Sequence, residues 1–540
     1  MFDLIIKDGK IIDGTGNPWF RGDLGIKNGK IARIGRLSPS EAEKKLEAKG
    51  LIVCPGFIDM HSHSDLSVFF NPKLDSTIRQ GVTTSVVGNC GLSLAPVNPE
   101  RKGLLIREAS SFLPICKELR IDWCRFDEYL SRLGEIGLSA NIANLVGHGT
   151  VRIAVMGLEN RDPTGEELAE MKKLVAEAME AGAFGLSTGL IYAPGVYSKA
   201  DEIIELCKIV AEYGGIYASH IRSERAMLLE AVKEAIRIGE KAKIPVEISH
   251  HKAAGKPNWG KTKETLRLME EARARGVDVT CDQYPYKAGM TSLAALLPPW
   301  VREGGVDKMI ERLRSLKERE RIREDMEKAT VEWENFASEC GWENIIVSSV
   351  SSEENKFLEG KSLAEIAKIR GTDEFTVLFD LLLEEEGGVS IVIFSMDERD
   401  IHRVMTSRLQ MVGTDSWAVA PYGILNIGKP HPRFYGTYPR ILGRYVREKK
   451  VLALEEAIRK MTSFPAQRLG LTDRGLLKPG MWADIVIFDP AKIKDKATYQ
   501  EPHQYPEGIE YVLVNGSVII EKGEHTGAPA GKVLRLKTDK

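Results

Sequence analysis

The sequence is poor in the features that mark membrane proteins, nucleic-acid-binding proteins and secreted proteins. No run of about 18 apolar residues occurs in it, and its start, MFDLIIKDGKIIDG, lacks the basic and apolar regions of a signal peptide. The 75 lysines and arginines nearly balance the 77 aspartates and glutamates, so no basic surface for nucleic acid is expected. We therefore expect a cytoplasmic protein with no membrane or nucleic-acid partner that acts on a small molecule; assembly into a homo-oligomer stays open.

Cysteine is also scarce. The seven cysteines are odd in number and form no CxxC pair, which argues against a disulfide framework and against a thiolate zinc ribbon. What the sequence does have is length. Its 540 residues exceed one ordinary domain and suit a barrel of about 250 residues or more that carries insertions and a satellite domain.

Both ends of the chain carry turn signals. Short β-branched runs are separated at three places by Asp-Gly or Asn-Gly, at Asp8-Gly9, Asn28-Gly29 and Asn515-Gly516. This pattern is typical of type I′ hairpins between antiparallel strands. Because the termini of one domain often lie close together, we expect residues 1–55 and 475–540 to form one small β-sandwich domain, with residues 56–474 inserted into it.

The middle of the chain alternates short apolar strands with amphipathic helices, which predicts an α/β fold built on a parallel sheet. Eight candidate strands occur, the number that closes a (β/α)8 TIM-type barrel: residues 56–63, 84–90, 142–149, 183–189, 216–222, 246–252, 278–286 and 411–417. Two further runs, NIIVSSV and VSIVIF, are alternatives to one of the eight. A charged segment, residues 287–345, interrupts the rhythm and is expected to form an inserted helical lid or, alternatively, a solvated surface helix.

Metal-ligating side chains gather at the ends of these candidate strands. They are His61, His63, Cys90, His148, His220, His250, His251 and Asp415. In a barrel the C-terminal ends of the strands form the face that carries chemistry. A single buried histidine is more often a hydrogen-bonded core residue than a ligand. Alternation along a strand, however, points His61 and His63 to the same side, where two neutral imidazoles can share one metal ion.

Several motifs resemble those of the amidohydrolase superfamily. The motifs that resemble the superfamily as a whole are PGFIDMHSHSD near the start, DLIIKDGKIIDGTG before it and LKPGMWADIVIFDP near the end. More narrowly, GVTTSVVGNCGLS, GHGTVR, GLSTGLIYAPGVYS, YASHIRSE, ISHHKAAG and HPRFYGTYPRILG are similar to the D-aminoacylase branch, the N-acyl-D-amino-acid deacylases. The resemblance runs the whole length of the chain and implies a barrel flanked by a small β domain.

The resemblance also implies a zinc site. Cys90, His220 and His250 match the ligands of one tight site, whereas His61, His63 and Asp415 would line or weakly hold a second position. Many relatives in the superfamily bridge two metals with a carbamylated lysine on strand four, but this chain has FGLST there, and the soft thiolate of Cys90 is the natural substitute. A metal-free role for His61 and His63 as hydrogen-bond donors stays open.

The implied reaction is hydrolysis of an N-acyl-D-amino acid to a carboxylic acid and a free D-amino acid. Asp415 would accept the proton of the attacking water and return it to the leaving amine; its alternative role is a structural N-cap. Arg433 and Lys252 match the positions that hold the substrate carboxylate. Tyr192 and Tyr284 would donate hydrogen bonds or serve in packing. The segment between Asp415 and Arg433, and Met290 in YKAGMTSL, depart from the pattern of the branch.

Two other functions remain as alternatives. A cyclic-amide hydrolase of the hydantoinase or dihydroorotase kind would share the barrel and the HxH pair, but the missing bridging lysine counts against it. A non-catalytic scaffold that has kept the fold and lost its metal would not need the full ligand set that this sequence retains. Bound zinc on the purified protein would separate the scaffold from both enzymes.

Overall fold

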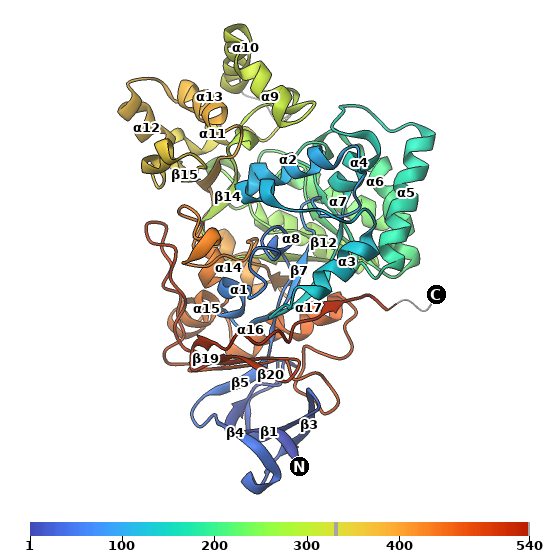
Figure 1. Cartoon of the computed structure of the whole chain (residues 1–540), viewed down its shortest axis with the longest axis vertical. Helices are drawn as coiled ribbons and strands as arrows, with labels where there is room; N and C mark the ends of the chain where they lie inside the picture. The colour runs from blue at the N-terminus through green and yellow to red at the C-terminus, as the bar shows by residue number, and fades with distance from the viewer. Residues whose placement is uncertain (329–332, 538–540) are drawn as a thin grey trace.

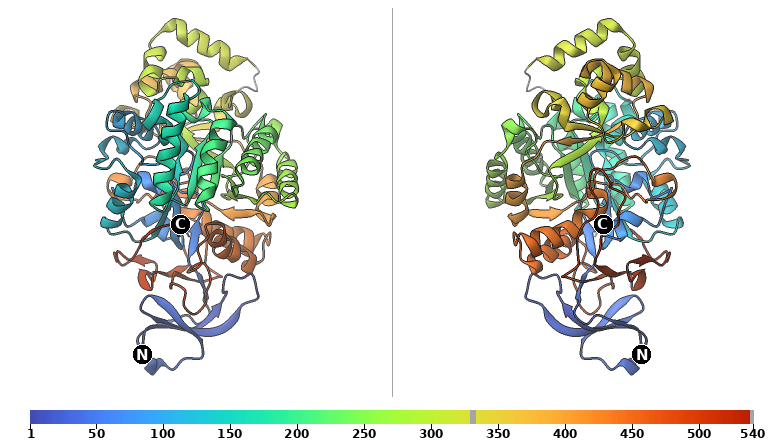
Figure 2. Two further views of the ribbon diagram at one scale, coloured as in Figure 1. Left: turned by 90° about the vertical axis from the view of Figure 1, so that its right-hand side faces the viewer. Right: turned by 90° about the vertical axis from the view of Figure 1, so that its left-hand side faces the viewer.

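The computed structural model describes residues 1–328 and 333–537 of the chain, which adopt a mixed α/β fold (Figure 1). Two parallel sheets occupy the middle, a mixed sheet lies at the bottom of the view, and a small antiparallel sheet with several helices lies at the top (Figures 1 and 2). Within the described residues, no helix has the length and apolar character needed to cross a membrane.

Strands from both ends of the chain share one nine-stranded sheet. The N-terminal strands are β1 (Phe2–Ile11), β2 (Phe20–Lys27), β3 (Lys30–Gly35), β4 (Ala42–Glu47) and β5 (Ile52–Pro55), and the C-terminal strands are β18 (Ile485–Phe488), β19 (Ile509–Val514), β20 (Ser517–Glu521) and β21 (Glu524–His525). The two sets meet where β5 pairs with β18 in antiparallel fashion. The last strand, β22 (Val533–Leu534), pairs instead with β8 of a parallel sheet.

Two of the three turn signals form hairpins, and one does not. Asn28-Gly29 joins β2 to β3 and Asn515-Gly516 joins β19 to β20, with positive φ at all four residues, as a type I′ turn requires. The hairpin predicted at Asp8-Gly9 is wrong. There β1 continues through a bulge, with Asp8 at φ 57°. A Cβ on Gly9 would lie 2.5 Å from a methyl of Val53 on the neighbouring strand, so the bulge needs glycine.

Each of the eight candidate strands of the sequence overlaps a strand of the two parallel sheets. These are β6 (Phe57–Asp59), β7 (Val82–Val87), β8 (Asn141–Asn144) with β9 (Val146–Gly147), β10 (Gly185–Gly189), β11 (Ile216–His220), β12 (Val246–Ile248), β13 (Val279–Gln283) and β17 (Gln410–Val412). Backbone hydrogen bonds join the sheets on both sides: Phe184 N–H, just before β10, donates to Asn144 O of β8 at 2.8 Å, and Met60 N–H donates to Val412 O at 3.2 Å.

Helices pack around these strands. They are α1 (Asp75–Ile78), α2 (Lys102–Phe112), α3 (Phe126–Glu135), α4 (His148–Met156), α5 (Gly165–Glu180), α6 (Ala200–Glu212), α7 (Leu228–Ala242), α8 (Thr262–Ala274), α14 (Glu398–Thr406), α15 (Arg433–Arg440), α16 (Leu454–Met461) and α17 (Ser463–Arg468). Local sequence explains their limits. Helix α5 begins at a capping box between Thr164 and Glu167, and α7 ends at Lys243 in a left-handed conformation.

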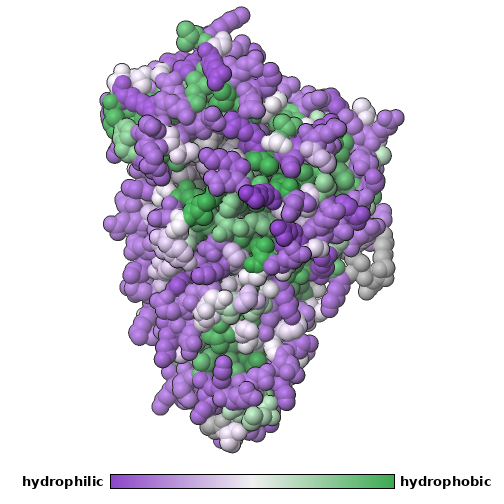
Figure 3. Space-filling view, in the orientation of Figure 1, coloured by the Kyte–Doolittle hydropathy of each residue, from purple (hydrophilic) through white to green (hydrophobic). Residues whose placement is uncertain are grey.

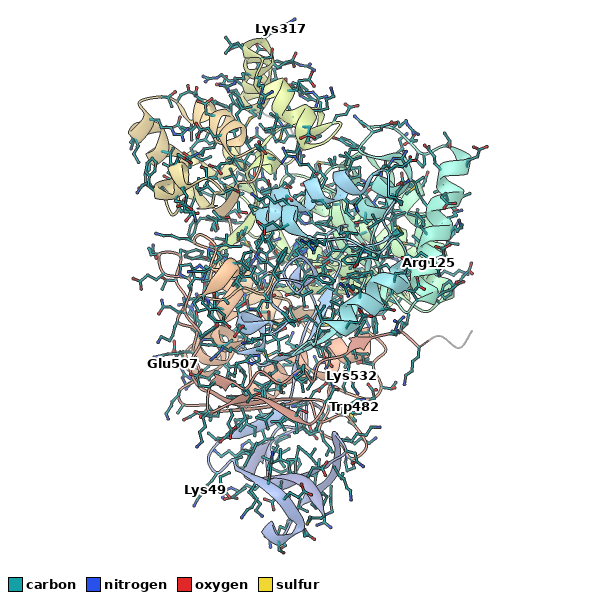
Figure 4. All side chains as sticks on the ribbon, in the orientation of Figure 1. Lys49, Arg125, Lys317, Trp482, Glu507 and Lys532 are labelled. Carbon is teal, nitrogen blue, oxygen red and sulfur yellow. The ribbon has the colours of Figure 1, made fainter. Side chains whose placement is uncertain are left out.

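The segment between β13 and β17 forms an insertion with its own core. It contains β14 (Ala288–Ser292), β15 (Ile345–Ser349) and β16 (Ser390–Phe394), paired as an antiparallel sheet, with α9 (Val306–Leu313), α10 (Leu316–Glu327), α11 (Phe336–Cys340), α12 (Leu363–Arg370) and α13 (Glu374–Glu384). The runs NIIVSSV and VSIVIF therefore belong to this sheet and displace none of the eight parallel strands. Lys317 lies at the tip of the insertion (Figure 4).

The insertion is tied to the loops that follow β11 and β12. Arg225 forms an ion pair with Glu339 at 2.7 Å, and Asn258 Nδ2 donates to the same carboxylate at 2.7 Å. Next to this contact, Ser223 Oγ donates to Glu334 Oε1 at 2.6 Å, while Glu334 Oε2 is buried with no hydrogen-bond partner. Burial raises the pKa of Glu334 to about 7, although Arg225 acts in the opposite direction.

Replacing Glu334 with glutamine should make the protein more stable in alkaline solution. The folded-state pKa of about 7 exceeds the ordinary 4.5, so the stability that this group contributes is present below the ordinary pKa and is lost as the pH rises through 7. The uncharged Glu334→Gln side chain avoids that loss. We expect a gain in unfolding free energy of about 1 to 3 kcal/mol at about pH 8 and a smaller one at about pH 5, measured by denaturant unfolding. Glu339→Gln, which breaks an ion pair, should destabilise at both values, and an equal effect of Glu334→Gln at both would contradict the prediction.

Candidate active site

Three ligand atoms converge at the C-terminal ends of β7, β11 and β12. The Sγ of Cys90 lies 3.6 Å from His220 Nδ1 and 3.5 Å from His250 Nε2. Ligands at their usual distances from one tetrahedral ion are separated by about 3.3 to 3.8 Å. One sulfur and two imidazole nitrogens at this spacing therefore fit a zinc-type ion, and the other ring nitrogen of His220, Nε2, is buried without a partner.

A second group shares the same cysteine. His61, His63, Cys90 and Asp415 each offer a ligand atom within 4.8 Å of the others. His61 Nε2 lies 3.3 Å from Cys90 Sγ, and Asp415 Oδ1 lies 3.6 Å from His61 Nε2 and 3.3 Å from His63 Nε2. Cys90 is thus the member common to both groups, in the place where a bridging ligand would stand.

Three of these residues have a left-handed backbone. Cys90 has φ 51°, His250 φ 35° and Asp415 φ 51°, a conformation that costs residues other than glycine of order 1 kcal/mol or more each. Backbone hydrogen bonds hold two of them: Asp415 N–H donates to His61 O at 2.7 Å, and His250 N–H donates to Asp282 Oδ1 at 2.8 Å. The fold therefore turns these side chains toward one point against the local preference of the chain.

Two carboxylates that the sequence did not single out support the ligands. Asp282, at the end of β13, accepts from His250 N–H through Oδ1 and places Oδ2 3.4 Å from His61 Nδ1. Glu224 Oε1 lies 2.8 Å from His250 Nδ1. Carboxylates behind ligating histidines fix the ring orientation and tautomer. The only sequence signal for either residue is its place just before or after a strand end, which many acidic residues share.

Charge in the site favours a thiolate and a carboxylate. Burial alone would raise the pKa of the Cys90 thiol, but His61, His220 and His250 hold it well below its usual range. Burial would likewise raise the pKa of Asp415, but the Arg433 guanidinium, followed by the neighbouring histidines, holds it well below its usual range. Both groups are therefore ready to act as anionic ligands or as a base.

The four predicted substrate-binding residues all lie at the same cavity. Arg433 Nη1 pairs with Asp415 Oδ2 at 2.8 Å, and its guanidinium lies 4.6 Å from the ring centroid of Tyr284. Lys252 Nζ pairs with Glu224 at 2.5 Å. Tyr192 contacts the ring of His220, with centroids 5.1 Å apart, and its hydroxyl lies 3.1 Å from Thr291 Oγ1 of the insertion. Whether these residues bind a substrate stays a prediction.

Two strand-end histidines lie outside the site. His148 begins α4, and its Nε2 lies 2.7 Å from Glu202 Oε1, a carboxylate that also pairs with Arg152. His251 Nε2 lies 2.7 Å from Thr265 Oγ1, and burial lowers the pKa of its imidazole to about 4. Both are core histidines with local partners, which is the ordinary role of a buried histidine.

All the candidate ligands except His61 line a cavity whose empty space, counted with its open mouth, is about 1200 Å³. Strand-end loops form one wall, and the insertion contributes the opposite wall through Met290, Thr291, Phe336 and Ile393. Apolar side chains make up most of the remaining lining. In Figure 3 the surface is mainly hydrophilic, and apolar residues gather in the middle of the face below the insertion.

Comparisons with known proteins agree with this geometry. The family model of the amidohydrolase family matches residues 46–520. The chain is 38% identical to D-aminoacylase of Alcaligenes xylosoxydans xylosoxydans over 99% of this chain and 97% of that protein, and 36% identical to N-acyl-D-glutamate deacylase of the same organism over 99% and 96%. It superposes with a TM-score of 0.83, at 35% identity and 99% coverage of both chains, on N-acyl-D-glutamate deacylase from Bordetella bronchiseptica, solved with zinc and a phosphonate inhibitor that mimics the tetrahedral intermediate. The chain therefore belongs to the amidohydrolase family, in its D-aminoacylase branch.

Proposed function

We propose that the chain is a zinc-dependent N-acyl-D-amino-acid deacylase. The observation that carries the proposal is the position of Cys90 between two groups of imidazoles, beside Asp415 and in the lining of a cavity large enough for a small substrate. The similarity to D-aminoacylase, to N-acyl-D-glutamate deacylase and to one solved structure of N-acyl-D-glutamate deacylase supplies the substrate class. Small molecules are the expected partners, and we propose a cytoplasmic location.

The same proposal extends to the architecture. The eight parallel strands with their flanking helices would close as a (β/α)8 barrel, residues 56–474, and the chain ends, 1–55 and 475–540, would form the small β domain. The backbone hydrogen bond from Met60 N–H to Val412 O supports the closure. The insertion would act as a lid because its residues line the wall opposite the ligand groups.

Each residue has a place in the reaction. Cys90, His220 and His250 would hold the tight zinc, and His61, His63 and Asp415 would hold a second, weaker one. When bound, zinc supplies an activated water and a Lewis acid for the scissile amide carbonyl. Asp415, kept anionic by Arg433, takes the proton of the water and returns it to the leaving nitrogen.

The substrate carboxylate would meet two cations that already have partners. Arg433 is paired with Asp415 and Lys252 with Glu224, so neither is an uncompensated buried charge before the substrate binds. A carboxylate that approaches Arg433 would share its fork of donors with Asp415. This arrangement ties substrate binding to the orientation of the base.

A panel of N-acetyl-D- and N-acetyl-L-amino acids, with zinc added and amine release followed, tests the assignment. We expect only the D series to turn over, because zinc and Arg433 fix two of the groups around the α-carbon. Arg433→Ala should cost about 1.5 to 3 kcal/mol in kcat/KM and reduce the preference between enantiomers. Equal rates for both enantiomers would exclude the D-specific assignment.

Dihydropyrimidine, hydantoin and dihydroorotate rings serve as the controls of that panel. Ser187 and Thr188 stand on β10, the strand on which hydantoinase-like relatives would carry a bridging lysine, and Thr188 Oγ1 is engaged with Tyr217 at 2.9 Å. We expect no ring opening. Ring opening at a rate comparable with deacylation would favour the cyclic-amide alternative, and a zinc-free, inactive protein would favour the scaffold.

A further inference from the structure

A small side pocket adjoins the cavity of the proposed active site. Glu108, Phe112, Tyr192 and Ala193 line both spaces, so the two adjoin at these residues. The far side of the side pocket is formed by α2, by β14 with the turn after it, and by the start of α9. None of the residues predicted from the sequence to hold metal lies in its lining.

Two oppositely charged side chains face this side pocket without pairing. Glu108, on α2, has a buried Oε1 with no hydrogen-bond partner. Arg302, at the end of a short 3-10 helix (Pro299–Arg302), donates from Nη1 to Ile191 O at 3.0 Å but has a buried Nε with no partner. The two interact only through space, since no ion pair joins them in the part of the chain that the structure describes.

An arrangement of this kind is costly unless something binds between the two groups. A buried polar atom without a partner costs about 1 to 3 kcal/mol, and more if it is charged. Burial raises the pKa of Glu108 to about 7 and lowers the pKa of Arg302, although each residue as a whole is half-buried. The pair thus offers one open acceptor and one open donor to a ligand.

We propose that this side pocket is a binding subsite for an uncharged carboxamide at the far end of the substrate. A carboxamide donates through its nitrogen and accepts through its oxygen, so it can satisfy Glu108 and Arg302 at once. A terminal carboxylate would be repelled by Glu108, and a terminal ammonium would be repelled by Arg302. A methyl end would leave both atoms unsatisfied.

The group must sit at the end of a chain of several atoms. His220 contacts Tyr192 with ring centroids 5.1 Å apart, and Tyr192 also lines the side pocket, so one aromatic ring separates the two imidazoles and Cys90 from the side pocket. Either the acyl chain or the side chain of the amino acid could span this distance. A carboxamide can stand at the end of either chain, and the experiment below tests the two positions separately.

The test compares kcat/KM for two matched series of substrates. The acyl series is N-hexanoyl-, N-adipamoyl-, N-adipoyl- and N-(aminohexanoyl)-D-leucine. The side-chain series is the N-acetyl derivatives of D-norleucine, D-aminoadipate side-chain amide, D-aminoadipate and D-lysine. In one of the two series, the substrate with the carboxamide end should have a kcat/KM about tenfold or more above that of the other three substrates. A difference of this size corresponds to one hydrogen bond to a charged group. The series that shows the preference identifies the part of the substrate that enters the side pocket.

Two charge-altering variants give a readout that a structural role would not produce. Glu108→Gln leaves Arg302 uncompensated and should move the preference toward the carboxylate end, whereas Arg302→Gln should move it toward the ammonium end. Lys102→Gln is the matched control, because Lys102 lies on the same helix and donates outside the side pocket to Ile121 O at 3.3 Å. Its order of preference should equal that of the wild type.

The subsite would be overturned if kcat/KM differed by less than twofold among the four ends in both series. It would also be overturned if Glu108→Gln and Arg302→Gln lowered kcat/KM equally on every substrate. This inference rests on the proposed deacylase function, and the two can fail separately. If N-acetyl-D-leucine with zinc is not hydrolysed, the function fails. Direct binding of hexanamide, hexanoate and hexylamine by calorimetry then decides the subsite, with hexanamide expected to bind the wild type most tightly and equal or absent binding overturning it.

Discussion

Replacing Cys90 with alanine should remove both zinc and activity. The thiolate is the one ligand common to the two groups, at 3.3 to 3.6 Å from His61, His250 and His220, so its loss leaves each group incomplete. We expect metal content to fall close to zero after dialysis and kcat/KM to fall by about a thousandfold or more, the equivalent of about 4 kcal/mol of lost Lewis-acid stabilisation. Metal analysis by mass spectrometry and amine release measure the two effects.

Cys281→Ala is the matched control. Cys281 lies on β13, is buried like a core residue, and has a thiol whose pKa burial raises well above its usual range. It belongs to neither ligand group. The control should keep zinc and activity and lose only some packing. A Cys90→Ala protein that retains zinc at the wild-type ratio would show that the imidazoles hold the metal without the thiolate.

Replacing Asp415 with asparagine should separate metal binding from catalysis. The tight group of Cys90, His220 and His250 does not include Asp415, so zinc should stay bound in it. The amide cannot take up a proton from water, and kcat should therefore fall by about two to four orders of magnitude. The measurement is kcat at saturating N-acetyl-D-leucine together with the zinc content of the same sample.

The variant Arg433→Lys, which changes the ion-pair partner of Asp415, distinguishes a role in substrate binding from a role in proton transfer. Arg433→Lys keeps a positive charge near the base but removes the fork of donors that pairs with it at 2.8 Å. It should raise KM more than it lowers kcat, whereas Asp415→Asn should lower kcat more than it raises KM. Near-normal kcat in Asp415→Asn would assign the proton transfer to another group, and His63, whose Nε2 lies 3.3 Å from Asp415, would then be the first to test.

The sequence predicts the parallel strands well because each is a short apolar run ending in a polar residue. It predicts the ligand set for a different reason: histidine and cysteine are rare enough that their repeated placement at strand ends stands out. Asp282 and Glu224 carry no such signal. Their importance comes from which ring nitrogen they face, and that depends on how separate loops meet.

Local signals fail where a distant part of the chain decides. Asp8-Gly9 has the composition of a hairpin turn, yet Val53 packs against Gly9 and the strand continues through a bulge. His148 and His251 follow strands as the candidate ligands do, but each has a local partner outside the two candidate metal groups. The pattern NIIVSSV predicts a strand correctly, and only its antiparallel partner in β16 shows that it belongs to the insertion.

The shared sheet of the two chain ends has a consequence for synthesis on the ribosome. Strand β5 leaves the ribosome early, but its neighbour β18 begins only at Ile485. At about 5 to 20 residues per second, β5 keeps an unpaired edge for on the order of a minute, and such edges invite pairing with other chains. In the complete fold the C-terminal part of the chain also lies near this sheet, where the Lys532 ammonium is 3.9 Å from the ring centroid of Trp482 (Figure 4). A nascent chain halted before Ile485 should therefore aggregate, whereas the released full-length chain should not.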